Sequence, residues 1–319
     1  MKVLFMGTPE FSIPSLEKLY NSSHHIVGVI TQPDRPKGRG YKVSSPPVKE
    51  KAEELGLSVW QPETINTKEF LQLLTELSPD VITTVSIAHY IPKNVWQYPR
   101  YGCINLHPSL LPKYRGTSPI VSAILNGDTE TGVTTFYIDE GWDSGDIILQ
   151  KKIRITNQDT RGSLTKKLAL LGSEVLLETL DLLEKGCAPR IPQDHSLATY
   201  TRKVHPRDGL INWDFPSVII ERQIRAYNPT PSSFTYFRGK RIKVLKATVG
   251  NSLSTDAYPG GTIIKLERGK GFWVATGRGE LLIEEVQPEG KRRMSAWEFH
   301  CGYKIKDGEL LKSILKEKQ

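Results

Sequence analysis

The chain has 319 residues, of which 38% are hydrophobic and 24% charged, and its formal net charge is +8 at pH 7. This length allows two domains, and the composition excludes a disordered or fibrous chain. There is no apolar run of about 18 residues, and the first residues predict a strand instead of a signal peptide, so we expect a cytoplasmic protein that does not span a membrane.

Positive charge is concentrated in the second half of the chain. The chain up to Pro189 contains 20 Lys and Arg and 21 Asp and Glu, whereas the chain from Arg190 onward contains 23 Lys and Arg and 14 Asp and Glu. This asymmetry indicates a polyanionic partner such as a nucleic acid, although a basic surface that is merely solvated is the alternative. The cysteines at 103, 187 and 301 form no Cys-x-x-Cys pair, so we expect no disulfide framework and no metal site.

The amino-terminal residues alternate between strand and helix patterns. Residues 2–6 predict a strand, helical spacing of apolar residues continues to Tyr20, and residues 25–31 predict a second strand. This order predicts an α/β fold with a Rossmann-like, doubly wound, mainly parallel sheet. Gly7 stands alone where a dinucleotide site needs Gly-x-Gly-x-x-Gly, so an NAD enzyme is not expected.

A basic segment follows the second strand. Arg35, Lys37, Arg39 and Lys42 lie within eight residues that contain no anion and are interrupted by Pro and Gly. We expect a mobile, exposed loop. It could order against a phosphate backbone, or it could be an ordinary solvated loop.

Alternating elements continue to residue 186. Residues 66–69 resemble a capping box that opens a helix, and residues 80–87 have the Val, Ile and Thr content of a buried parallel strand. His89 follows that strand, where a lone histidine is more often structural than catalytic. The remaining expected elements are a helix over 48–55, a short strand over 57–60, a helix over 119–125, strands over 132–138 and 147–155, and a helix over 164–182.

The most informative stretch covers residues 103–116. Asn105 and His107 are two apart in a predicted strand, so their side chains point to the same face, and Pro108 should end the strand there. The pair then lies at a strand's carboxyl end, where open α/β sheets hold ligands. Asp143, in a turn rich in Gly, Ser and Asp, follows 36 positions later and could complete a small active site. A satisfied polar strand end is the structural alternative, and Asp146 is the alternative carboxylate.

Residues 187–208 contain three prolines and no sustained periodicity, as is typical of a linker. We therefore expect a first domain over 1–189, a linker over 190–208 and a second domain over 209–319. In the second domain a helix over 218–227 precedes short strands over 234–237, 242–245, 261–266, 271–276 and 280–286, and a last helix begins near Ser295. Short strands with glycine turns predict a small antiparallel barrel, a scaffold that often binds nucleic acids.

These residues carry a family resemblance. The chain resembles the folate-dependent formyltransferases in the run Asn-Leu-His-Pro-Ser-Leu-Leu-Pro at 105–112 and in Asp143, which follows His107 by 36 positions. These enzymes move a formyl group from N10 of 10-formyltetrahydrofolate to an amine. Within this superfamily, residues 7–9, 31–36, 212–214, 224–229 and 294–296 resemble the members that act on methionyl-tRNA, across essentially the whole chain. Residues 86–91, where an aromatic-Gly pair is expected, and Trp142, where Leu is common, depart from the family pattern.

The resemblance implies a Rossmann-like catalytic domain, a linker and an OB-like carboxyl-terminal barrel that binds tRNA. Asn105 and His107 would donate hydrogen bonds to the oxyanion that forms when an amine attacks the formyl carbonyl. Asp143 would order a water for proton transfer and hold His107 in its useful charge state. The tetrahydrofolate would lie against Ser109, Leu110, Leu111 and Pro112.

Among the tRNA contacts, Arg39 matches the position that the family uses against the acceptor stem of the initiator methionyl-tRNA, with Arg35, Lys37 and Lys42 beside it. Two alternatives remain open. A formyltransferase acting on a small amine, such as a nucleotide sugar or glycinamide ribonucleotide, would leave the basic loop without a role, and a catalytically inactive RNA-binding relative would not need the catalytic residues. We expect a monomer, since no exposed apolar stripe is obvious.

Overall fold

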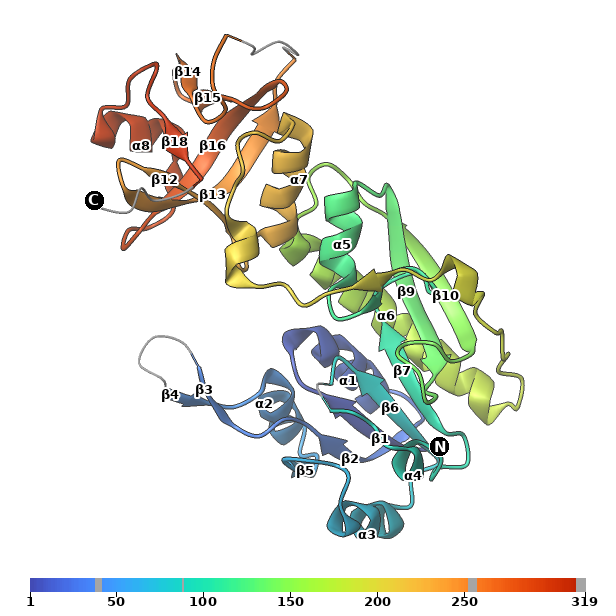
Figure 1. The fold of residues 1–319 in the computed structure, drawn as a ribbon. Helices are drawn as coiled ribbons and strands as arrows, with labels where there is room; N and C mark the ends of the chain where they lie inside the picture. The colour runs from blue at the N-terminus through green and yellow to red at the C-terminus, as the bar shows by residue number, and fades with distance from the viewer. Residues whose placement is uncertain (38–41, 88, 252–256, 314–319) are drawn as a thin grey trace. The chain divides into compact units, whose positions relative to one another are not determined.

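The computed structural model describes residues 1–37, 42–87, 89–251 and 257–313 (Figure 1). The chain divides into two compact units. Unit 1 comprises Met1–Pro119, Glu130–Arg154 and Thr165–Arg202, and unit 2 comprises Ile120–Thr129, Ile155–Leu164 and Lys203–Gln319. The expected domain boundaries and the linker over 190–208 stay predictions. The first part of that segment, up to Arg202, is grouped with unit 1.

Unit 1 is built on a seven-stranded sheet in the order β10-β9-β7-β6-β1-β2-β5. The pairs from β5 to β7 are parallel, and the β7–β9 and β9–β10 pairs are antiparallel. This is the Rossmann-like, mainly parallel sheet that the sequence predicts. Its strands are β1 (Lys2–Gly7), β2 (His25–Ile30), β5 (Val59–Trp60), β6 (Val81–Val85), β7 (Cys103–His107), β9 (Glu130–Tyr137) and β10 (Ile147–Arg154).

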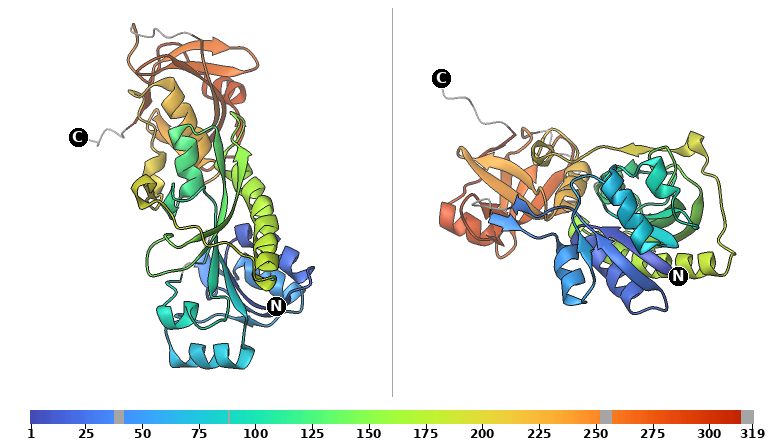
Figure 2. Two further views of the ribbon diagram at one scale, coloured as in Figure 1. Left: turned by 90° about the vertical axis from the view of Figure 1, so that its right-hand side faces the viewer. Right: turned by 90° about the horizontal axis from the view of Figure 1, so that it is seen from below.

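Helices cover both faces of this sheet. On one face Leu4, Ile82 and Cys103 share a core with Phe70 of α3 and Val95 of α4. On the other face lies the long helix α6 (Figure 2). It packs so closely on the strands that a Cβ at Gly172 would come within 2.7 Å of Leu106. The helices up to residue 200 are α1 (Ile13–Tyr20), α2 (Pro47–Glu54), α3 (Lys68–Leu77), α4 (Lys93–Trp96), α5 (Pro119–Asn126) and α6 (Arg161–Glu184), with the 3-10 turns η1 (Glu10–Ser12) and η2 (His195–Leu197). Most of α5 and the first residues of α6 are grouped with unit 2.

Two local expectations were wrong. The basic segment is not wholly irregular, because β3 (Arg35–Lys37) and β4 (Lys42–Ser44) pair antiparallel, with Lys37 opposite Lys42. Residues 38–41 lie outside the described residues. The helix expected to open with a capping box at 66–69 begins one residue later, because Thr67 is its N-cap and accepts a hydrogen bond from the Phe70 N–H at 3.2 Å.

Unit 2 holds an antiparallel sheet in the order β14-β15-β16-β13-β12-β18, with β17 beside β16. A bridge between Thr262 and Leu310 joins the chain next to β14 to the chain next to β18, so the sheet curls into the expected OB-like barrel. Its elements are η3 (Pro206–Gly209), α7 (Ser217–Tyr227), β12 (Ser233–Phe237), β13 (Lys240–Val249), β14 (Ile263–Glu267), β15 (Gly271–Ala275), β16 (Glu280–Pro288), β17 (Met294–Ser295), α8 (Ala296–Tyr303) and β18 (Leu311–Lys312).

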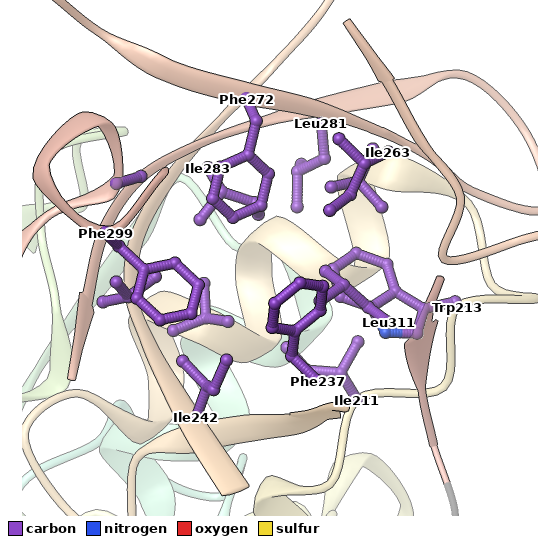
Figure 3. Close-up of a cluster of buried hydrophobic side chains, with 14 of the residues drawn as sticks. Ile211, Trp213, Phe237, Ile242, Ile263, Phe272, Leu281, Ile283, Phe299 and Leu311 are labelled. Atoms are coloured by element: carbon purple, nitrogen blue, oxygen red, sulfur yellow. The ribbon is translucent and has the colours of Figure 1, made fainter. Parts of the chain in front are cut away.

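Large apolar side chains fill the interior of this barrel. Trp213, Phe272 and Phe299 are each at most 2% exposed and pack together with Ile242 and Leu281 (Figure 3). The indole N–H of Trp213 donates to Thr235 Oγ1 at 3.0 Å, so its one polar atom is satisfied inside the core. In neither unit does the described part contain a helix with the length and apolarity that crossing a bilayer requires.

Candidate active site

Asn105 lies near the carboxyl end of β7 and is partly exposed. Its neighbour in the register of β6 is Thr84, whose hydroxyl donates to Asn105 Oδ1 at 2.8 Å. Because the amide oxygen is taken by this bond, the amide nitrogen faces the other way. Within the described residues Nδ2 has no hydrogen-bond acceptor, so it is a fixed donor available to a ligand.

His107 is the last residue of β7 and only 4% exposed. Its Nε2 lies 2.9 Å from the carbonyl oxygen of Tyr114. Since a carbonyl can only accept, Nε2 carries the proton and donates it. The other ring nitrogen, Nδ1, faces Asp143 Oδ2 at 3.6 Å. That distance is too long for a direct hydrogen bond, so the carboxylate lies beside the ring without bonding it directly.

Asp143 approaches His107 from the turn between β9 and β10. Its carboxylate Oδ2 accepts the backbone N–H of Gly116 at 2.7 Å, which fixes the oxygen that faces the imidazole. The residue has a φ of 49°, a left-handed backbone conformation that residues other than glycine rarely adopt. The carboxylate is therefore held from two sides, by its own backbone conformation and by Gly116.

The segment from Ser109 to Pro112 follows β7 directly. Ser109 is fully buried and its hydroxyl donates to the Lys113 carbonyl at 2.7 Å, while Leu111 is 3% exposed. Gln150 Nε2 donates to the Leu111 carbonyl at 2.8 Å and so fixes the backbone. The side chains of Leu110 and Pro112 are the partly exposed ones of the four. Of the four residues, Leu110 and Pro112 therefore offer the surface that a ligand can contact.

The basic residues of the β3–β4 hairpin are described only in part. Arg35 pairs with Glu63 at 2.9 Å, but both side chains are more than 60% exposed, so solvent weakens this ion pair. Lys37 and Lys42 are paired in the backbone register of β3 and β4. Arg39 lies outside the described residues.

The other residues considered from the sequence are not part of the group formed by Asn105, His107 and Asp143. Nε2 of His89 is buried and has no hydrogen-bond partner among the described residues, and desolvation lowers the pKa of this imidazole. Trp142, beside Asp143, is 62% exposed. In the described part of the chain no three His, Cys, Asp or Glu side chains gather as a metal site would require.

Sequence reasoning did not single out the groups that orient these side chains. Thr84, the Tyr114 carbonyl and the Gly116 N–H each contact one of the three predicted residues. Two of these groups are backbone atoms, and a contact through the backbone does not depend on which amino acid stands at that position, so the sequence does not reveal it. The buried strand β6 carries two adjacent threonines, Thr83 and Thr84, and only the contact shows that the hydroxyl of Thr84 is the one that bonds Asn105.

The structure thus brings an amide donor and an imidazole to one strand end, with a carboxylate 3.6 Å from the imidazole. The model of the formyl transferase family matches residues 1–180, and that of its carboxyl-terminal domain matches residues 203–304. The chain therefore belongs to the formyl transferase family.

Within this family, the chain is 45% identical over 318 residues to the methionyl-tRNA formyltransferase of Halothermothrix orenii, covering 98% of this chain and 100% of the relative. A solved methionyl-tRNA formyltransferase from Clostridium thermocellum has a TM-score of 0.55 at 18% identity, covering 79% of this chain and 95% of that one. The N-formyltransferase of Helicobacter canadensis, solved with folinic acid and dTDP-3-aminofucose, has a TM-score of 0.64 at 20% identity, covering 90% of this chain and 99% of that one. The two solved structures support the fold.

Proposed function

We propose that this protein transfers the formyl group of 10-formyltetrahydrofolate to the amino group of initiator methionyl-tRNA, giving N-formylmethionyl-tRNA for translation initiation. The full-length similarity to a methionyl-tRNA formyltransferase supports the substrate pair. The observation that carries the chemistry is the arrangement of Asn105, His107 and Asp143 at the end of β7.

Asn105 is the residue that stabilises the developing charge. When the neutral amine attacks the formyl carbon, the carbonyl oxygen becomes an oxyanion, and a fixed donor lowers the energy of that state. The Nδ2 atom meets this requirement because Thr84 orients the amide and leaves the nitrogen without another acceptor in the described residues. No reorganisation is then needed during the reaction.

His107 and Asp143 assist the proton transfers of the reaction. The amine loses a proton after attack, and N10 of the folate gains one as its bond to the formyl carbon breaks. Asp143 Oδ2 accepts the Gly116 N–H and lies 3.6 Å from His107 Nδ1, so the carboxylate is fixed beside the imidazole. From this position Asp143 can order a water that carries the proton from the amine to N10.

The folate would lie along the segment from Ser109 to Pro112. Gln150 and Thr134 fix this backbone from the neighbouring strands, with the Thr134 hydroxyl donating to the Ser109 carbonyl at 2.7 Å. A rigid segment next to the catalytic strand end suits a donor that must present its formyl group at one position. The side chains of Leu110 and Pro112 would supply the apolar contacts.

The tRNA would be held by cationic parts of the chain. Arg35, Lys37, Arg39 and Lys42 of the hairpin segment would contact the acceptor stem. The second half, with 23 Lys and Arg against 14 Asp and Glu, would attract the phosphate backbone. We propose further that the protein acts in the cytoplasm as a monomer.

A transfer assay separates this function from its rivals. Formyl-labelled 10-formyltetrahydrofolate is offered with methionyl-tRNA, with uncharged tRNA, with a dTDP-amino sugar and with glycinamide ribonucleotide. We expect label in methionyl-tRNA alone. Label in a small amine, at a rate equal to or above that for methionyl-tRNA, would favour the small-amine function. Retention of tRNA on a filter without any transfer would favour the inactive RNA-binding relative.

A further inference from the structure

Unit 1 contains a buried guanidinium that the proposed mechanism does not use. Arg115 is 2% exposed, and within the described residues no carboxylate lies at ion-pair distance from it. Burying an unpaired charge is unfavourable unless its hydrogens are all bonded. Here the acceptors are neutral groups of one later segment: Gln193 Oε1 at 2.7 and 3.2 Å, His195 Nδ1 at 3.1 Å and Tyr200 Oη at 3.3 Å.

This arrangement fixes the orientation of the Gln193 amide. A guanidinium can only donate, so Oε1 of Gln193 must face Arg115 and Nε2 must face the opposite way. There Nε2 donates to the carbonyl of Asp143 at 3.0 Å and to the carbonyl of Gly145 at 2.8 Å. Gln193 is 6% exposed, so both of its amide hydrogens bond inside the protein, to the turn that carries Asp143.

The Asp143 turn needs such support, because Asp143 holds a left-handed φ of 49°. The same late segment also supports the carboxylate end. Arg115 and Gly116 form β8 (Arg115–Gly116), which pairs with β11 (Tyr200–Thr201). Gly116 then donates its N–H to Asp143 Oδ2 at 2.7 Å. One connected set of bonds therefore fixes both the backbone and the side chain of Asp143.

We propose that Arg115 and Gln193 are positioning residues that hold the Asp143 carboxylate toward His107. They act through the turn and the β8 strand and contact neither substrate. This inference rests on the proposed function, in which Asp143 takes part in proton transfer. Loss of the Gln193 amide would let the turn relax out of its left-handed conformation and move Oδ2 away from both Gly116 and His107.

The test compares two variants of one residue. Gln193→Ala removes the amide, whereas Gln193→Glu keeps the size and an oxygen for Arg115 but cannot donate to the two carbonyls. For both we expect kcat to fall roughly 10- to 100-fold, the range for a misplaced catalytic group, with KM for each substrate within about 3-fold of wild type. Gln193→Glu keeps the experiment decisive if Gln193→Ala fails to fold, because the new carboxylate can pair with Arg115.

Unit 2 offers a matched control in Gln223. This residue is 8% exposed, and its Nε2 also donates to two backbone carbonyls, those of Asp208 and Leu210, each at 3.0 Å. Gln223→Ala therefore loses the same pair of donated bonds at similar burial, whereas Gln193→Ala also removes the oxygen that accepts from Arg115. We expect Gln223→Ala to lower the melting temperature by no more than Gln193→Ala does, and to leave kcat at saturating substrates unchanged. Equal kcat values in Gln193→Ala, Gln193→Glu and Gln223→Ala would overturn the proposal.

A second comparison asks whether Gln193 acts through Asp143. The double variant Asp143→Asn, Gln193→Ala should be no slower than Asp143→Asn alone, because the positioned group has already been lost. Losses that multiply would overturn the proposal. If Asp143→Asn alone keeps the wild-type kcat, the role of Asp143 in the proposed function is wrong and the positioning role falls with it. If Asp143→Asn is slow while the Gln193 variants are not, the positioning role alone is wrong.

Discussion

The orientation of the Asn105 amide can be tested through Thr84, which does not take part in the reaction itself. The Thr84 hydroxyl donates to Asn105 Oδ1 at 2.8 Å and is 1% exposed. Thr84→Val keeps the shape of the side chain and removes the hydroxyl, which also makes a longer contact of 3.3 Å with the Ile104 carbonyl. A hydrogen bond of this kind has a net value of about 0.5–1.5 kcal/mol, which corresponds to a factor of roughly 2–10 in favour of the productive orientation. We therefore expect kcat to fall by about 2- to 10-fold.

The neighbouring residue supplies the control. Thr83 lies on the same strand, is fully buried, and its hydroxyl has no hydrogen-bond partner in the described part of the chain. Thr83→Val therefore makes the same chemical change without loosening the amide, and it should leave kcat unchanged and stability equal or slightly higher. Asn105→Ala removes the donor altogether and should lower kcat by about 10²- to 10³-fold, or about 2.7–4 kcal/mol.

Single-turnover rates of formyl transfer, measured with both substrates saturating, give the three losses directly. The expected order is Thr83→Val, then Thr84→Val, then Asn105→Ala, from no loss to the largest. If Thr84→Val and Thr83→Val have the same rate while Asn105→Ala is slow, the amide acts without the orientation that Thr84 gives it. If Asn105→Ala retains wild-type turnover, the amide does not stabilise the oxyanion.

Three further outcomes follow from other parts of the chain. Arg39→Ala should lower kcat/KM for methionyl-tRNA and flatten its dependence on salt concentration, and an unchanged salt slope would remove Arg39 from the tRNA contacts. Burial lowers the pKa of His89 from the ordinary value of 6.5, so an NMR titration should give a midpoint below that value, with His89→Gln used to assign the signal. A midpoint at or above 6.5 would contradict the desolvation of His89. Trp213→Phe should cost about 2 kcal/mol in urea unfolding, because it leaves a cavity and removes the hydrogen bond to Thr235 Oγ1, and a loss below about 0.5 kcal/mol would contradict the bond drawn there.

Much of the fold was predictable because local pattern and tertiary structure agree. Pro108 was expected to end the strand that carries Asn105 and His107, and β7 does end at His107. The intervening Leu106 packs on Gly172 of α6, on the face opposite the amide and the imidazole. The alternation of a strand therefore placed these two side chains on one side before any long-range contact was known.

The errors arose where two local solutions have similar energies. Asn66 and Thr67 are both good N-caps, and the helix uses Thr67, whose hydroxyl bonds the Phe70 N–H. In the basic segment the glycines and Pro36 suggested an irregular loop, yet its ends pair as β3 and β4. Local composition does not decide between an open loop and a hairpin when the pairing adds so few backbone bonds.

The supports of the site could not be read from the sequence at all. Gln193 reaches the Asp143 turn across 50 positions, and Arg115 reaches Gln193 across 78. Local spacing alone does not indicate that a glutamine from a proline-containing stretch contacts the turn that carries Asp143. Strand alternation and the family resemblance together indicated the three predicted site residues, whereas the hydrogen bonds that hold them appear only once the chain is folded.

The central claim is that the end of β7 carries formyl transfer to a charged tRNA. It is tested most directly by measuring two properties of His107→Ala side by side, retention of methionyl-tRNA on a filter and the single-turnover rate of formyl transfer at saturating 10-formyltetrahydrofolate. We predict wild-type retention of the tRNA with a rate lower by about 10²-fold or more. Wild-type turnover by this variant would contradict the claim.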